Sequence, residues 1–130
     1  MTVARVLLVE DHATMRASLR AILVAEGHAV EEAVDGRAAL EAIAAAPPDL
    51  VVLDLHVPVI DGGGVLAALR ASPDTAGLPV IVVTATGEEE RRATMALGAD
   101  AYLTKPFGPP ALLRLVAQVL PGGGRPAASP

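Results

Sequence analysis

Apolar residues along the chain fall into two patterns, short unbroken runs and longer segments in which they recur every third or fourth position. The short runs are typical of strands buried on both faces of a sheet, and the wider spacing is typical of helices packed on that sheet. The segment with Glu31 and Glu32 is more polar, which places it near a sheet edge. The predicted strands are Ala4–Val9, Ala29–Ala33, Leu50–Asp54, Pro79–Val83 and Ala101–Leu103.

Segments with helical spacing follow each of these strands. The predicted helices are Thr14–Ala25, Gly36–Ala46, Val65–Ala71, Glu88–Leu97 and Pro110–Leu120. We expect the third helix to begin only at Val65, because Gly63 and Gly64 would each cost about 1 kcal/mol relative to alanine inside a helix.

Strands and helices alternate strictly through residues 1–120. This alternation predicts a single α/β domain with a five-stranded parallel sheet, helices on both faces and right-handed crossovers. The remaining residues, 121–130, are rich in glycine and proline and have no periodicity. They are predicted to form a flexible tail or linker.

The composition excludes several classes of function. The 130 residues carry a net charge of −5 and only 2% aromatic residues, which argues against direct nucleic-acid binding. The chain has no cysteine, so disulfides and thiolate metal sites are excluded. No apolar run approaches the roughly 20 residues that span a membrane, and the N-terminal sequence lacks a signal-peptide pattern. We therefore expect a soluble, cytoplasmic domain without membrane partners.

Polar side chains follow four of the five predicted strands. The carboxyl ends of parallel strands share one edge of the sheet, where ligands bind in open α/β folds. The residues at this edge are Glu10 and Asp11 after the first strand, Asp54 at the end of the third, Thr84 after the fourth and Lys105 after the fifth. Each has a structural alternative when taken alone, as a helix or turn cap or as an ordinary surface residue.

Taken together, these groups point to one chemistry. Three carboxylates about 5 Å apart repel by roughly 3 kcal/mol per pair at an effective dielectric constant near 20. Such a cluster either raises its pKa values or binds a cation, and oxygen ligands favour Mg²⁺. An ammonium and a hydroxyl group beside them can engage phosphoryl oxygens. The set predicts a phosphoryl-transfer site in which a carboxylate is the nucleophile.

The order of these motifs resembles that of the receiver domain of two-component response regulators. The resemblance extends from about Arg5 to Leu120. It implies a flavodoxin-like (βα)5 domain with strand order 2-1-3-4-5. The matching motifs are Val9-Glu10-Asp11, Asp54-Leu55-His56-Val57-Pro58 with Asp61-Gly62, Val82-Val83-Thr84-Ala85, and Lys105-Pro106-Phe107 followed by Leu112-Leu113.

The resemblance implies a role for each residue that matches at the acidic end. Asp54 would be the phosphoryl acceptor. The implied Mg²⁺ ligands are Asp11, Asp54, the backbone carbonyl of His56 and, through a water molecule, Glu10. Apart from its own phosphorylation and dephosphorylation, the domain would catalyse no reaction.

The resemblance also implies a switch and partners. Lys105 and Thr84 would contact the phosphoryl group, and the bond to Pro106 would be cis. Thr84 and Tyr102 would transmit phosphorylation to the surface of the fourth helix, fifth strand and fifth helix. The implied partners are a sensor histidine kinase or phosphotransfer protein and a downstream effector or fused output domain.

Three other functions remain open. A pseudo-receiver would bind a partner without being phosphorylated, although the acid, threonine and lysine set is complete. A cobalamin-binding domain would need glycine at position 59, where Val59 stands. A phosphatase with an aspartyl nucleophile would need a second acid two residues after Asp54, where His56 stands.

Overall fold

The computed structural model describes residues 3–85 and 87–120, so the predicted tail at 121–130 lies outside the described residues. Strands and helices alternate along the described chain. They are β1 (Arg5–Val9), α1 (Ala13–Ala25), β2 (Ala29–Ala33), α2 (Gly36–Ala45), β3 (Leu50–Leu53), α3 (Gly62–Ala71), β4 (Val80–Thr84), α4 (Glu88–Ala96), β5 (Ala101–Thr104) and α5 (Pro109–Val119). All bounds except the start of α3 lie within one residue of the prediction.

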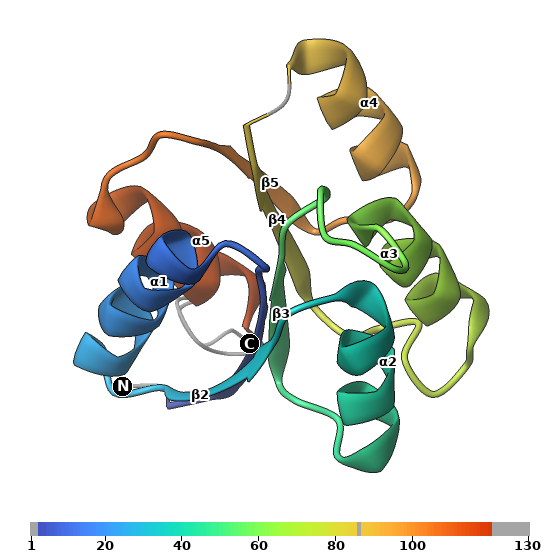
Figure 1. Cartoon of the computed structure of the whole chain (residues 1–130), viewed down its shortest axis with the longest axis horizontal. Helices are drawn as coiled ribbons and strands as arrows, with labels where there is room; N and C mark the ends of the chain where they lie inside the picture. The colour runs from blue at the N-terminus through green and yellow to red at the C-terminus, as the bar shows by residue number, and fades with distance from the viewer. Residues whose placement is uncertain (1–2, 86, 121–130) are drawn as a thin grey trace, which may run out of the picture.

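The strands form one parallel sheet in the order β2-β1-β3-β4-β5, which confirms the predicted fold. Figure 1 shows α1 and α5 on one face of this sheet and α2, α3 and α4 on the other. The strand order reverses at β1, which lies between β2 and β3. In open α/β sheets the ligand site lies outside the carboxyl ends of the strands at this reversal.

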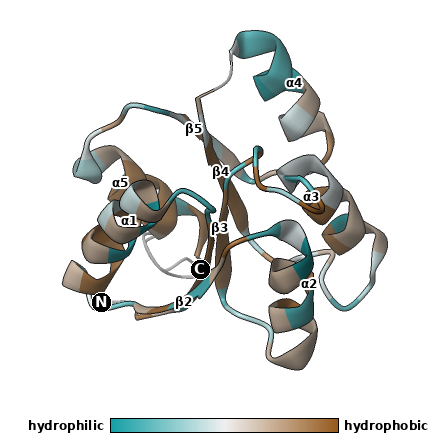
Figure 2. Cartoon of the chain, viewed as in Figure 1, coloured by the Kyte–Doolittle hydropathy of each residue, from teal (hydrophilic) through white to brown (hydrophobic). Residues whose placement is uncertain are grey.

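Neighbouring residues of each strand contribute to two different cores. In β1, Val6 and Leu8 pack with α1 and α5, whereas Leu7 and Val9 pack with α2 and α3. All four side chains are almost completely buried. Because both faces are covered, the inner strands are largely apolar, and Figure 2 shows most of the sheet as a hydrophobic layer between more polar helices. The edge strand β2 is the exception, since its Glu31 and Glu32 are exposed.

The predicted start of the third helix is wrong, because α3 begins at Gly62 and not at Val65. Asp61 caps the helix, and its Oδ1 accepts a hydrogen bond of 2.8 Å from the backbone N–H of Gly64. A Cβ atom on Gly62 would lie 2.5 Å from the carbonyl oxygen of Asp54. The cap offsets the low helix propensity of glycine. The absence of a Cβ atom on Gly62 lets the start of the helix pack directly against the end of β3.

Among the described residues, every helix is too short or too polar to cross a lipid bilayer.

Candidate functional site

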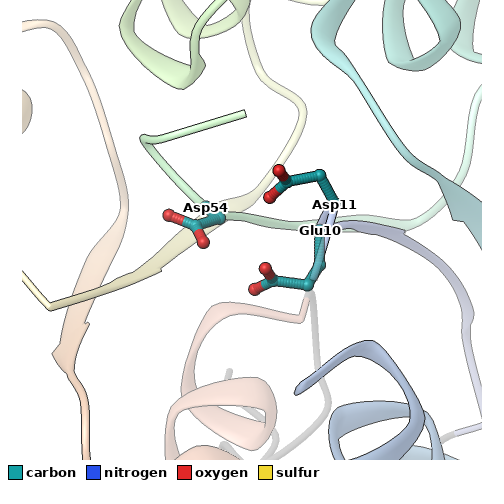
Figure 3. A group of neighbouring side chains, drawn as sticks. All are labelled: Glu10, Asp11 and Asp54. Atoms are coloured by element: carbon teal, nitrogen blue, oxygen red, sulfur yellow. The ribbon is translucent and has the colours of Figure 1, made fainter. Parts of the chain in front are cut away.

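Three carboxylates lie together where β1 and β3 end. Glu10 and Asp11 follow β1, and Asp54 follows β3 (Figure 3). One oxygen atom from each carboxylate lies within 4.8 Å of those of the other two. Glu10 and Asp54 are buried, whereas Asp11 is exposed, so the cluster is accessible from one side. The residue that begins α1 as its N-cap is His12, so Asp11 does not serve as the helix cap.

Lys105 brings a positive charge into this cluster from the end of β5. Its Nζ lies 3.0 Å from Oε1 of Glu10 and 3.0 Å from Oδ2 of Asp54. The peptide bond between Lys105 and Pro106 is cis, as the resemblance implied. One ammonium group is therefore shared between the two buried carboxylates.

The surroundings shift the three pKa values differently. Burial raises the pKa of Glu10, and the hydrogen bond from Lys105 offsets only part of this effect. Burial also acts to raise the pKa of Asp54, but hydrogen bonds from the backbone N–H of His56 and from Lys105 outweigh it, so the pKa is lowered. Burial acts to lower the pKa of Lys105, but the two carboxylates raise it. Asp54 is thus held as a carboxylate beside an ammonium ion.

Thr84 ends β4 and is fully buried. Its Oγ1 has no hydrogen-bond partner among the described residues. Leaving a buried hydroxyl unpaired costs on the order of 1–3 kcal/mol, so a hydrogen-bond partner for this atom would stabilise the domain. The carbonyl of Thr84 accepts a 2.8 Å hydrogen bond from the backbone N–H of Lys105, which ties the ends of β4 and β5 together.

The other two predicted site residues, Tyr102 and His56, differ in burial and in their contacts. The Tyr102 side chain is 7% exposed and belongs to the core between the sheet and α2 and α3. The guanidinium carbon of Arg91 in α4 lies 5.6 Å from the centre of the Tyr102 ring. The side chain of His56 is exposed, and its backbone N–H donates a 3.0 Å hydrogen bond to Oδ1 of Asp54.

A pocket of ≈ 470 Å³ adjoins the cluster between the β3–α3 loop and α4. Its polar lining comes from Asp11, His56, Asp61, Glu90 and Thr94. A small molecule therefore has room to approach the acids from this side.

The donor set fits Mg²⁺. The ligand atoms available are carboxylate oxygens, one of the three carboxylates is open to solvent, and Mg²⁺ is usually bound through one or two carboxylates with several retained waters. A divalent ion also removes the repulsion between acids that a single Lys105 ammonium cannot neutralise.

The sequence did not single out Arg16. This side chain in the first turn of α1 donates from Nη1 to the carbonyl oxygens of Glu10, at 3.0 Å, and Asp11, at 3.3 Å. Its charge could have identified it from the sequence, because a cation in the first turn of a helix is unfavourable with the helix dipole and so requires another reason to be there.

Lys105→Met is expected to lower the free energy of unfolding by about 3 kcal/mol in EDTA, because two buried carboxylates lose their cation. Added Mg²⁺ is expected to restore much of this loss, since it binds the folded state and no longer competes with an ammonium group. Urea unfolding with and without Mg²⁺ measures both effects.

The matched control for this prediction is Arg37→Met. Arg37 pairs with Glu41 on the surface of α2, and their side chains are 73% and 69% exposed. Such a pair contributes less than about 1 kcal/mol. Equal losses in the two variants, with no response to Mg²⁺, would contradict the shared role of Lys105.

Comparison with known proteins agrees with this fold. The family model for the response regulator receiver domain matches residues 6–117. The response regulator MprA of Mycolicibacterium vanbaalenii is 46% identical over 116 residues, which cover 88% of this chain and 48% of that protein. The transcriptional regulatory protein PrrA of Mycobacterium tuberculosis is 42% identical over 120 residues, covering 92% of this chain and 49% of that protein. The chain thus spans about half the length of these relatives.

Solved structures show the same architecture. A response regulator from Chloroflexus aurantiacus superposes with a TM-score of 0.87 at 33% identity, over 91% of this chain and 98% of that one. The receiver domain of a sensor histidine kinase from Pseudomonas aeruginosa has a TM-score of 0.83 at 28% identity, over 90% of this chain and 97% of that one. That structure has a magnesium ion coordinated in its active-site cleft.

The parallel sheet, with an acidic cluster at its carboxyl edge, places the domain in the flavodoxin-like α/β class. The chain belongs to the response regulator receiver domain family. Domains of this family are generally signalling modules without enzymatic activity of their own, and they bind Mg²⁺ at an acidic pocket. Family membership leaves the cobalamin-binding and aspartyl-phosphatase alternatives without support.

Proposed function

We propose that this domain accepts a phosphoryl group on Asp54 with the help of Mg²⁺. The observation that carries the proposal is the ionised Asp54 carboxylate, hydrogen-bonded by Lys105 and grouped with Glu10 and Asp11. The proposed Mg²⁺ ligands are Asp11, Asp54, the backbone carbonyl of His56 and, through water, Glu10.

In the proposed step, an Asp54 carboxylate oxygen attacks phosphorus. A new O–P bond forms while the bond to the leaving group breaks, and the leaving group takes the bonding electron pair. The Lys105 ammonium and the unpaired Thr84 hydroxyl then donate hydrogen bonds to phosphoryl oxygens. Mg²⁺, when bound, offsets the negative charge of the acids and the phosphoryl group.

The proposed switch follows from the charge that phosphorylation adds. The phosphoryl group brings about −1.5 to −2 charges to the site. Thr84 and Lys105 reorient toward it, and they lie at the ends of the paired strands β4 and β5, of which β5 contacts α4. Only Thr94 of α4 is buried, so little packing holds this helix in place. Because Tyr102 is already buried here, the proposed change at this residue is repacking against α4 and Arg91, which alters the α4-β5-α5 surface.

The proposed phosphodonor is a sensor histidine kinase or a phosphotransfer protein. The proposed reader of the altered surface is a downstream effector or a fused output domain.

The test is to incubate the unmodified protein with acetyl phosphate, with Mg²⁺ or with EDTA, and to measure its intact mass. We expect one added phosphoryl group, which requires Mg²⁺ and is released by hydroxylamine as an acyl phosphate. No added mass at any Mg²⁺ concentration would overturn the proposal and favour the pseudo-receiver.

A further inference from the structure

Arg16 clamps the main chain that carries two of the three acids. Its Nη1 contacts the consecutive carbonyl oxygens of Glu10, at 3.0 Å, and Asp11, at 3.3 Å. One nitrogen that bonds two successive carbonyls fixes the orientation of both peptide groups. Because these peptide groups carry the side chains of Glu10 and Asp11, their orientation limits where the two carboxylates can lie.

The helix dipole does not explain the location of Arg16. The helix dipole makes a cation unfavourable in the first turn of α1. The two hydrogen bonds to carbonyls compensate for this, because bonds to charged groups are about twice as strong as neutral ones. The hydrogen bonds to Glu10 and Asp11 therefore account for the position of Arg16.

A partner on the edge strand holds the Arg16 side chain in position. Its Nε donates a 3.2 Å hydrogen bond to Oε1 of Glu32 in β2. The Arg16 side chain is only 20% exposed and that of Glu32 only 31%, so this pair is partly shielded from solvent. The other Glu32 oxygen accepts a 3.1 Å hydrogen bond from Arg20, whose Nη1 also donates to the carbonyl of Val30 in β2.

We propose that Arg16 is a positioning residue for the Mg²⁺ site, a role that rests on the proposed function. Arg16 does not touch the ion. It holds the turn between β1 and α1 so that the carboxylates of Glu10 and Asp11 converge on Asp54. Glu32 supports it from the neighbouring strand.

The test is the dissociation constant for Mg²⁺ without any phosphodonor, measured from backbone amide chemical shifts in NMR titrations. Arg16→Lys keeps the charge but loses the planar donor group, and Arg16→Gln loses both. We expect both variants to bind Mg²⁺ about 10-fold more weakly, the lower end of the effect of losing residues that support metal ligands. Saturating Mg²⁺ is expected to restore the rate of phosphorylation by acetyl phosphate.

The control is Arg20→Gln, which removes a hydrogen bond to the same Glu32 but leaves the hydrogen bonds from Arg16 to the carbonyls of Glu10 and Asp11 in place. We expect its Mg²⁺ affinity to stay within twofold of the unmodified protein. Unchanged affinity in both Arg16 variants would overturn the role. Tighter binding in Arg16→Gln, with no change in Arg16→Lys, would also overturn it, because Arg16 would then act only through charge. If the unmodified protein binds no Mg²⁺, the proposed function itself fails.

Discussion

Asp54→Asn is expected to take up no phosphoryl group from acetyl phosphate in the presence of Mg²⁺. The asparagine amide keeps the size of the side chain and can still accept the hydrogen bond from His56, but it lacks a carboxylate that can attack phosphorus. Intact-mass measurements over a time course, with the unmodified protein alongside, give the result directly.

The matched control is Asp61→Asn. Asp61 lies in the same β3–α3 segment, where it caps α3. Asparagine is an equally good cap, so this variant is expected to fold normally and to become phosphorylated. Phosphorylation of Asp54→Asn at the rate of the unmodified protein would place the acceptor on another residue.

The fold was predictable because a parallel sheet imposes a simple pattern. With both faces covered, an inner strand is apolar along most of its length, as Val80–Thr84 is, so these strands were predicted to within one residue. The strand order was not predictable from periodicity. It came from the motifs of the family, and it determines which strand ends lie side by side.

The grouping of the site residues was predictable from topology, but their contacts were not. Lys105 and Glu10 are 95 positions apart in the chain, and their 3.0 Å contact depends on how the ends of β1 and β5 project over β3. The bond from the His56 backbone to Asp54 depends on local loop geometry in the same way. Residue types identify the chemistry, whereas the folded main chain sets the distances.

The β3–α3 loop shows where local propensity fails. Val59 has a positive φ of 73°, a conformation that β-branched residues rarely adopt, and its side chain is 71% exposed. Helix α3 begins among glycines that propensity would exclude. Both features arise because the loop is held at two points. The Pro58 carbonyl accepts a hydrogen bond from Gly36 of α2, and Gly62 packs closely against the end of β3.

Gly36→Ala is expected to destabilise the protein by about 3 kcal/mol, at the upper end of the usual cost of overpacking. Gly36 is the first residue of α2 and is buried against the β3–α3 loop. A Cβ atom there would lie 1.8 Å from the carbonyl oxygen of Ile60 and 2.6 Å from its carbonyl carbon. Because these are main-chain atoms, no side-chain rotation relieves the clash, and the loop itself must move.

Gly77→Ala is the control for this change. A Cβ atom on Gly77 would meet no atom within 4 Å, and Gly77 is not among the glycines with positive φ. Alanine there is expected to be neutral or to stabilise by about 0.4–1 kcal/mol, through the lower entropy of the unfolded chain. Urea unfolding of both variants measures the difference, with the m-value showing whether each still unfolds in one step.

The movement that Gly36→Ala forces also bears on the site. The backbone N–H of Gly36 donates a 3.2 Å hydrogen bond to the carbonyl of Pro58, within the loop that joins Asp54 to α3. Displacing this loop shifts the His56 backbone, which both hydrogen-bonds Asp54 and supplies a proposed Mg²⁺ ligand. We therefore expect weaker Mg²⁺ binding in the folded fraction of Gly36→Ala, measured by NMR titration. Unchanged stability and affinity would mean that the loop adapts freely, contrary to the tight packing at Gly36.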